Sequence, residues 1–572
     1  SAIATTSGTL TKNDTGTLIL SGTNTYTGLT SITGGVVNVR NNAGLGTTAG
    51  GVTVALGSAL ELQGNITIGA EALSLTGTGV GSNGALRNIS GTNSYAGLIT
   101  LAGPTTIQSD VGSLLTLSGG IDGAGQNLTI EGLGDTTVSS AIATTSGTLT
   151  KNDTGTLLLS GGNTYTGKTT INGGVLRIDA DNRLGVAPGV ATAGHLTFGG
   201  GTLETTATFE LAANRGVALT GAGTFDVTTG VLTYNGIIAG GGGILTKAGV
   251  GTLVLGGVNT YTTATTINGG VLSIDADSRL GTVPGGATAG HLTFGGGTLE
   301  TTATFELAAN RGVALTGAGT FDVNSGTTLT YNGIIAGGGG ILTKADAGTL
   351  VLGGVNTYTT AMAVTAGVLN IRNSQGLGTV AGGTTVSNLA ALELQGSITI
   401  SAETLSLTGT GVGGEGALRN ISGTNSYAGL ITLAGPTTIQ SDVGSLLTLS
   451  GGIDGAGQNL TIEGLGDTTV SSAIATTSGT LTKNDTGTLI LSGTNTYTGL
   501  TSITGGVVNV RNNAGLGTTA GGVTVALGSA LELQGNITIG AEALSLTGTG
   551  VGSNGALRNI SGTNSYAGLI TL

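Results

Sequence analysis

Hydrophobic and polar residues alternate along this chain in short stretches. In residues 52–54, 60–62, 66–68 and 73–75, two apolar residues flank one polar residue. This alternation is typical of β-strands with one buried face. The first apolar positions lie at 52, 60, 66 and 73, so the pattern returns after 21 residues. Three short strands in each coil of about 21 residues predict an all-β fold, a parallel β-helix or β-solenoid.

The segments between these stretches are rich in Gly, Asn, Asp and Ser, which reach left-handed backbone angles at low cost. No apolar stripe with helical spacing extends over ten residues. We therefore expect sharp corners and no long helix. The glycine runs 240–243 and 337–340 lack the Lys-Ser/Thr ending of a phosphate loop, so we interpret them as flexible corners.

Long internal repeats organise the sequence. Residues 1–101 recur unchanged as residues 472–572, and residues 84–157 recur as residues 416–489. One lysine motif occurs five times, with its lysines spaced 139, 96, 97 and 139 residues apart. These spacings predict one continuous β-solenoid over residues 1–572. Its expected repeat blocks are long (8–146), short (147–242), short (243–339), long (340–478) and partial long (479–572).

The motif combines a lysine with glycine, leucine, asparagine and tyrosine at fixed spacing. We expect a structural role for all of them. The lysine should lie at the rim of its strand, with its head reaching water or turn carbonyls. The tyrosine should pack on turn residues, with display of a binding surface as the alternative. The motif residues are Lys12, Gly16, Leu18, Leu20, Asn24, Tyr26, Lys151, Tyr165, Lys247, Tyr261, Lys344, Tyr358, Lys483 and Tyr497.

The composition excludes several classes of function. The 572 residues include 114 glycines and no cysteine, and the net charge is −12. A sparse, acidic charge does not favour a nucleic-acid partner. Without cysteine there is no disulfide framework, no thiolate metal site and no cysteine nucleophile. No apolar run reaches the 18 residues of a membrane-spanning helix.

The five motif copies resemble the passenger-associated β-strand repeat of bacterial autotransporters and large surface adhesins. The resemblance rests on Lys12, Gly16, Asn24, Tyr26 and Gly28 and on their counterparts in the later copies. It is weaker in the third and fourth copies, where Thr263 and Thr360 replace the final glycine. The resemblance implies a right-handed parallel β-helix, an extracellular or cell-surface location and export through the bacterial envelope.

Two pairs of carboxylates are candidates for catalysis. Asp179 with Asp181, and Asp275 with Asp277, lie two residues apart and could hold a cation or a water, as acidic pairs do in β-helix enzymes that cleave polysaccharides. Each pair lies at a strand end, before an arginine and a Leu-Gly step. Aspartate and arginine commonly cap turns and form surface ion pairs there, so we expect turn chemistry and no catalysis.

The remaining ionisable candidates are expected to point outward. Each of the glutamates lies between two inward apolar residues, and each histidine precedes a Leu-Thr-Phe strand without a second metal ligand nearby. We therefore expect solubilising charges and no metal or cofactor site. These residues are Glu61, Glu210, Glu306, His195 and His291.

These observations favour a non-catalytic structural repeat protein, an extracellular fibre or adhesin stalk on a bacterial surface. One alternative is a carbohydrate-active β-helix enzyme. Another is an ice- or crystal-surface-binding solenoid, which would need Thr-x-Thr at one fixed offset in most coils, whereas the threonine offsets drift along the sequence. Neither end of the sequence carries a polar cap, so we expect end-to-end self-association or a longer continuous chain. A cell-surface or glycan ligand also fits this picture.

Overall fold

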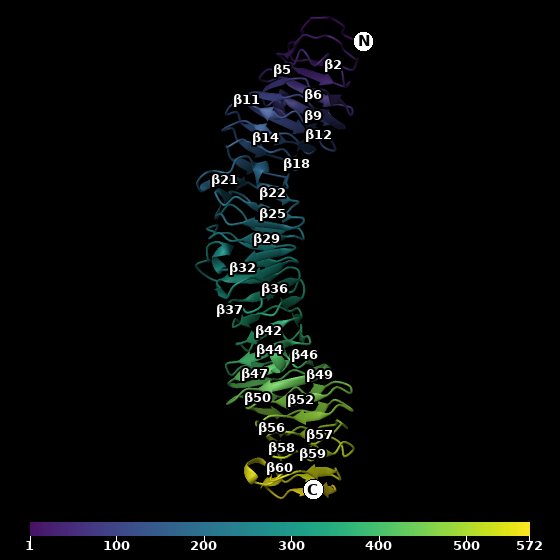
Figure 1. The fold of residues 1–572 in the computed structure, drawn as a ribbon, viewed down its shortest axis with the longest axis vertical. Coiled ribbons are helices and arrows are strands. Elements are labelled where there is room, and N and C mark those ends of the chain that lie inside the picture. The colour runs from purple at the N-terminus through teal and green to yellow at the C-terminus, as the bar shows by residue number, and fades with distance from the viewer. The chain divides into compact units, whose positions relative to one another are not determined.

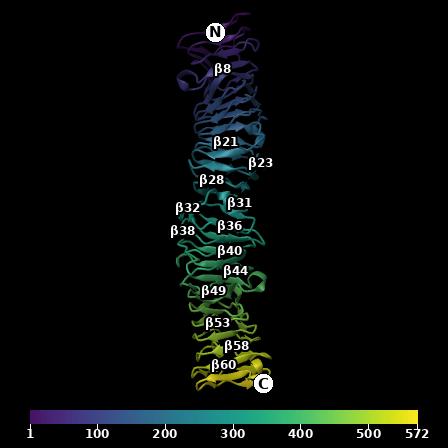
Figure 2. The same cartoon turned by 90° about the vertical axis from the view of Figure 1, so that its left-hand side faces the viewer.

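The computed structural model describes residues 1–572 and contains 65 short β-strands and five single-turn 3-10 helices. The strands pair in parallel, each with the strand one coil away, and a coil takes about 22 residues. The predicted all-β parallel β-solenoid is confirmed. The chain forms two compact units, Ser1–Ser273 with Ser278–Val283, and Ile274–Asp277 with Pro284–Leu572. In Figure 1 the coils of the first unit run from purple to teal, and Figure 2 turns the same coils by a quarter turn.

The first unit has three sides, each a stack of parallel strands. The first side contains β1 (Leu10–Lys12), β3 (Thr30–Ile32), β5 (Val52–Val54), β8 (Leu73–Gly77), the start of β11 (Ile99–Ser109), β13 (Ile121–Asp122) and β16 (Ile142–Ala143). The second side contains β2 (Thr17–Leu20), β4 (Val36–Val39), β6 (Ala59–Gln63), β9 (Leu86–Ser90), the end of β11, β14 (Leu128–Glu131), β17 (Leu149–Lys151), β19 (Thr169–Ile171), β21 (Thr192–Phe198), β24 (Arg215–Leu219) and β27 (Ile238–Gly240). The third side contains β7 (Thr67–Ile68), β10 (Thr92–Tyr95), β12 (Leu114–Leu117), β15 (Asp135–Val138), β18 (Thr156–Leu159), β20 (Val175–Ile178), β22 (Thr202–Thr205), β25 (Gly223–Val227), β28 (Leu245–Ala248) and β30 (Thr265–Ile267). A shorter stack joins β23 (Phe209–Leu211), β26 (Val231–Tyr234) and β29 (Thr252–Leu255).

The second unit is built in the same way. One stack contains β34 (Phe305–Leu307), β37 (Thr328–Tyr331), β40 (Thr349–Leu352), β42 (Gly367–Ile371), β44 (Ala390–Gln395), β47 (Leu418–Ser422), the end of β49 (Ile431–Ser441), β52 (Leu460–Glu463), β55 (Leu481–Lys483), β57 (Thr501–Ile503), β59 (Val523–Val525) and β62 (Leu544–Leu546). Another contains β33 (Thr298–Thr301), β36 (Gly319–Val323), β39 (Leu342–Ala345), β41 (Met362–Val364), β43 (Thr384–Val386), β46 (Leu405–Gly409), the start of β49 and β51 (Ile453–Asp454). A third contains β45 (Thr399–Ile400), β48 (Thr424–Tyr427), β50 (Leu446–Leu449), β53 (Asp467–Val470), β56 (Thr488–Leu491), β58 (Val507–Val510), β60 (Ala530–Gln534) and β63 (Leu557–Ser561).

Apolar side chains form continuous ladders inside each unit. On the third side of the first unit, Leu157, Leu176, Leu203 and Phe225 are register partners on consecutive coils, and each is fully buried. The ring of Phe225 meets that of Phe198 edge to face, with 5.2 Å between ring centroids. Each buried apolar side chain of this kind stabilises the fold by roughly 1.5–3 kcal/mol, so the ladders supply the main driving force for folding.

The lysine motif moves to the next side of the coil with each block. In the first unit, the first motif strand of the second copy, β17, stacks on the side that holds β2, the second strand of the first copy. Likewise β28 of the third copy stacks on the side of β18. In the second unit, β55 stacks on the side of β40. At about 22 residues per coil, spacings of 139 and 96 residues both leave about one third of a coil, which explains the advance.

Candidate functional site

Four of the five motif lysines donate hydrogen bonds to three backbone carbonyls, and Lys483 donates to two. Lys151 Nζ contacts the carbonyl oxygens of Asn152, Asp153 (2.9 Å) and Gly173 (3.4 Å), the last from the following coil. The head of Lys151 reaches turn carbonyls as expected, but the expected position at the rim of the strand is wrong for this copy, because Lys151 is only 2% exposed. Burial lowers the pKa of Lys151 to about 8, against the opposing effect of Asp153. The same burial holds for Lys247, Lys344 and Lys483, whereas Lys12 is half-buried.

The motif asparagine joins three successive coils. Asn163 Oδ1 accepts a hydrogen bond from the Ile142 amide one coil back (2.8 Å), and its Nδ2 donates to the Arg183 carbonyl one coil ahead (2.5 Å). The segment around Asn163 has no strand in its own coil, so these bonds satisfy backbone groups that a strand would otherwise pair. Asn24, Asn259, Asn356 and Asn495 repeat the arrangement.

The motif tyrosines are buried, and most bond a threonine four residues ahead. The hydroxyl groups of Tyr165 and Thr169 lie 2.8 Å apart, and burial raises the pKa of Tyr165 to about 12. The expectation that the tyrosine packs inside the coil agrees with its burial. In the fourth copy Met362 stands at the threonine position, and the Tyr358 hydroxyl has no partner.

The motif glycine and leucines also face the neighbouring coils. A Cβ at Gly155 would lie 2.0 Å from the Gly134 carbonyl oxygen, so no larger residue fits there. The equivalent Gly16 lies in the first coil of the sequence and has open space at this point. Leu20 is 4% exposed and Leu18 is half-buried, as expected for leucines that face the inside of the coil.

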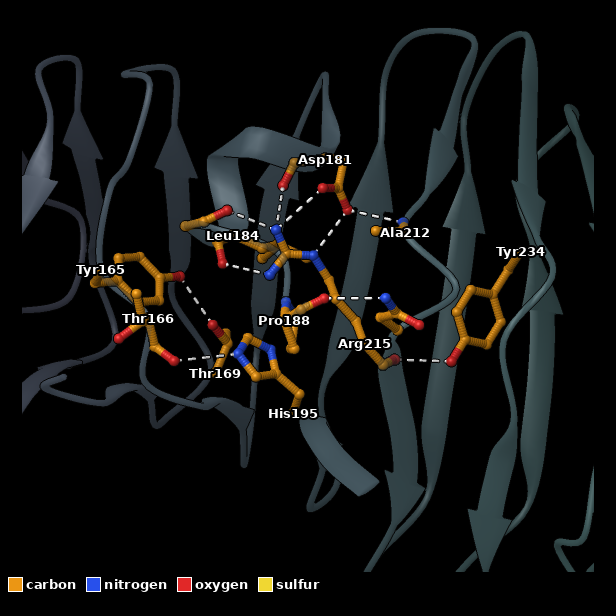
Figure 3. Close-up of polar contacts among 12 residues, drawn as sticks. Tyr165, Thr166, Thr169, Asp181, Leu184, Pro188, His195, Ala212, Arg215 and Tyr234 are labelled. Carbon is orange, nitrogen blue, oxygen red and sulfur yellow. Dashed lines mark hydrogen bonds and ion pairs between the residues drawn. The ribbon is translucent and has the colours of Figure 1, made fainter. Parts of the chain in front are cut away.

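A buried arginine lies at the centre of the largest polar cluster in the first short block (Figure 3). Arg215 is 1% exposed, and its Nε and Nη2 contact the two carboxylate oxygens of Asp181 at 2.8 and 3.0 Å. Its guanidinium group also donates to the Leu184 and Gly185 carbonyls at 2.8 and 2.5 Å. These contacts connect the segment 181–185 with the start of β24. In the second short block, Arg311 contacts Asp277 in the same way, at 2.9 and 3.1 Å.

The candidate carboxylate pairs do not converge on one site. The Asp179 carboxylate bonds Arg183 Nε at 2.6 Å, and this pair holds the pKa of Asp179 below its usual range. Asp181 instead bonds Arg215 and the Ala212 amide. Both carboxylates are therefore engaged in turn and ion-pair chemistry, as expected. Asp275 is exposed.

The histidine prediction is wrong. His195 and His291 are 4% and 5% exposed, not outward-facing. A register shift in β21 between Thr192 and Leu196 allows His195 and Leu196 to be buried together. His195 Nε2 lies 3.3 Å from the Thr166 carbonyl oxygen, and burial lowers the pKa of His195. No group of three or more metal-ligating side chains lies close together anywhere in the structure.

The glutamates behave as the alternation predicts. Glu210 and Glu306 are exposed and accept hydrogen bonds from Asn235 and Asn332 at 2.9 and 2.8 Å. Glu61 is half-buried on the outer surface, where it accepts a hydrogen bond from Asn38 at 3.1 Å.

Sequence reasoning missed several buried charges outside the lysine motif, and the five most deeply buried of them are Arg215, Arg311, Glu71, Glu403 and Glu542. Each precedes an inward apolar residue by two positions, so the alternation itself carries the signal for burial.

One surface groove lies beside β24. This groove of about 360 Å³ in the first unit is lined by small and apolar residues such as Ala193, Val217 and Ile237, without any ionisable side chain. One ladder of threonines is aligned although their sequence offsets drift: Thr106, Thr129, Thr150, Thr170 and Thr197 are register partners on successive coils. Among these five coils, only Thr148-Leu149-Thr150 has a second threonine two positions away on the same face.

The comparisons with known proteins agree with the motif. The Passenger-associated-transport-repeat family matches five segments, residues 10–39, 149–178, 245–274, 342–371 and 481–510, so each lysine motif is a repeat of this kind. Part of the chain is similar to the adhesin BmaC autotransporter of Brucella suis biovar 1, with 29% identity over 28% of this chain. The chain spans about 7% of the length of that relative. No solved structure matches. None of the helices has the length and apolar character needed to cross a membrane.

Proposed function

We propose that this chain is a non-catalytic structural segment of a bacterial autotransporter passenger, a solenoid stalk of an adhesin displayed outside the cell. The observation that carries the proposal is the inward use of the repeat motif. In every copy the asparagine bonds backbone groups of neighbouring coils, and in the first four copies the lysine also bonds a carbonyl of the following coil. The motif therefore stabilises the stacking of coils, and each added copy of the repeat lengthens the solenoid.

The competing carbohydrate-active enzyme has less support. A glycosidase needs two carboxyl groups facing one substrate across a short gap. Asp179 and Asp181 each bond a different arginine instead. An ice-binding surface has less support too, because only one of the five coils of the aligned ladder contains a Thr-x-Thr pair.

The location can be tested on intact cells. Antibodies raised against residues 147–339 should label unpermeabilised bacteria, and added protease should remove the label. Labelling that requires permeabilisation would contradict the display outside the cell.

Removal of one repeat, residues 151–246, should leave the protein folded and displayed, because Lys247 would replace Lys151 at the same step of the motif.

Catalysis and self-association need separate measurements. Incubation of the chain with pectin-like and chitin-like polysaccharides should release no reducing ends, and release that is abolished by Asp181→Ala would establish the enzyme.

We also propose end-to-end association of chains. Light scattering and electron microscopy at rising concentration should then show lengthening particles, whereas a strictly monomeric particle would refute the association.

A further inference from the structure

Each long block contains one buried glutamate that has no ion-pair partner. Glu71, Glu403 and Glu542 are 2%, 3% and 3% exposed, and no lysine or arginine lies within ion-pair distance of their carboxyl groups. The short blocks place an arginine at the same step of the coil: Arg215 precedes Val217 by two residues, as Glu71 precedes Leu73. The arginine has Asp181 as counter-charge, whereas the glutamates have none.

Each of these glutamates has two tyrosines as electrostatic neighbours. Tyr26 and Tyr95 are the titratable groups that interact electrostatically with Glu71, and the Gly51 amide donates a hydrogen bond to its carboxyl group. The Tyr26 hydroxyl is engaged with Thr30 at 2.7 Å. Glu71 Oε1 and the Tyr95 hydroxyl are both buried without any partner.

The other two long blocks contain the same cluster. Tyr497 and Tyr566 face Glu542, and the Glu542 Oε1 and Tyr566 hydroxyl have no partner. Around Glu403, the hydroxyls of Tyr358 and Tyr427 have no partner, while Thr384 donates to Oε1 at 2.7 Å. In this block Met362 stands at the register position of Thr30, and Thr384 stands at that of Val52. The threonine hydroxyl therefore bonds the glutamate here, whereas in the first block it bonds the tyrosine.

An ionised carboxyl group in such surroundings is costly, because it loses hydration without gaining a cation. The neutral acid loses less hydration, and it carries an O–H that can bond a tyrosine oxygen. Burial accordingly raises the pKa of Glu71, Glu403 and Glu542 to about 7.

We propose that these three glutamates bind protons inside the solenoid, so that the long blocks, unlike the short blocks, gain stability as the surroundings become mildly acidic. The sign follows from proton counting. Between pH 4.5 and about 7 the folded glutamate holds a proton that the unfolded one has lost, so stability falls as pH rises through this range.

Hydrogen exchange of the full chain, corrected for intrinsic exchange rates, tests the proposal with an internal control. The opening equilibrium of residues 69–77 should increase between pH 5 and pH 8 relative to that of residues 213–219, which contain Arg215. A shift of the carboxyl pKa from 4.5 to about 7 corresponds to a change of about 70-fold between pH 5 and pH 8. Equal pH dependence in both segments would overturn the proposal.

Variants assign the effect to the carboxyl group. Glu71→Gln keeps the shape without an ionisable group, so it should abolish the pH dependence of residues 69–77 and leave residues 401–409 unchanged. Glu210→Gln, at an exposed position, should change nothing. If the glutamine variant does not fold, infrared spectroscopy of the parent still decides: a protonated carboxyl band that disappears between pH 6 and 8 is expected, and its absence at pH 6 would overturn the proposal.

A bound cation is the competing occupant. Hydrogen exchange at pH 8, measured once in potassium chloride and once in choline chloride, distinguishes a bound cation from a bound proton. Equal protection in both salts is expected. Potassium-dependent protection of residues 69–77 that is lost in Glu71→Gln would mean that the carboxylate binds the metal ion, and the proton assignment would fall.

Discussion

Lys151 shows why a charged side chain can belong to the interior of a β-solenoid. Its ammonium group reaches carbonyls on both sides of a sharp corner and one on the following coil. Asp153 at this corner has a positive φ of 54°, a conformation that turns its carbonyl toward the lysine. The charge is therefore held by backbone dipoles that the corner would otherwise leave unpaired.

Replacing this lysine should loosen its coil. Lys151→Met keeps the apolar stem but leaves three part-buried carbonyls without this donor, so we expect a loss of about 1–3 kcal/mol in local stability. Hydrogen exchange of residues 149–175 measures it. Lys168→Met, at an exposed position of the same block, is the control and should change little. Equal effects of the two substitutions would show that the carbonyl contacts do not stabilise the coil.

The two aspartates of the first short block provide a matched pair. Asp181→Ala leaves the Arg215 guanidinium buried without its carboxylate, and we expect a loss of about 3 kcal/mol in the free energy of unfolding. Asp179→Ala removes only an ion pair at the surface, so its effect should stay below about 1 kcal/mol. Denaturant titration compares the two variants. A larger loss for Asp179→Ala would reverse these roles.

At the scale of an element, the motif asparagine replaces a strand. Asn163 connects Ile142, its own coil and Arg183 where no ladder exists. Asn163→Ala should therefore raise exchange at the Ile142 amide and cost about 1–3 kcal/mol locally. Asn163→Asp should cost less at Ile142, because it keeps the acceptor oxygen. Asn172→Ala, whose side chain is exposed, is the control.

Alternation in the sequence predicts the strands well and the burial of charges less well. The apolar positions 52, 60, 66 and 73 fall in or beside β5, β6, β7 and β8. Glu71 and Lys151 each lie two positions from an inward residue, Leu73 and Leu149, so alternation predicts that they are buried. Their charge, taken alone, predicts that they are exposed. The register shift that buries His195 has no local sequence signal, since it depends on the neighbouring strand.

The sequence pattern of a single coil also could not predict that the motif moves to the next side of the solenoid with each block. This advance depends on the remainder that a block length leaves after whole coils, and corners of different length decide that remainder. Continuity of the solenoid through all five blocks stays a prediction.

At the scale of the whole molecule, buried groups of three kinds give stability a distinctive pH profile. Above the glutamate range, the next groups are the interior lysines, whose pKa burial lowers from 10.5 to about 8 in Lys151, Lys247, Lys344 and Lys483. Between these values the unfolded chain binds more protons than the folded one, so stability rises with pH.

The tyrosines set the upper limit of this rise. Burial raises the pKa of Tyr165 from 10 to about 12, and the pKa values of Tyr26, Tyr358 and Tyr497 shift in the same direction. Above pH 10 an unfolded tyrosine ionises while a folded one stays neutral, so stability falls again. We therefore expect a minimum of stability between pH 7 and 8 and a maximum near pH 10.

Urea midpoints measured at one-unit steps from pH 5 to pH 11 test this profile. Lys151→Met combined with Lys247→Met should flatten the rise between pH 8 and 10, because two of its four contributing groups are gone, while the fall between pH 5 and 7 should persist. The combined variant Glu71→Gln, Glu403→Gln and Glu542→Gln should flatten only that fall. A parent chain whose midpoint is constant from pH 5 to 10 would contradict both assignments, because it would mean that the buried lysines and glutamates titrate as they do in the unfolded chain.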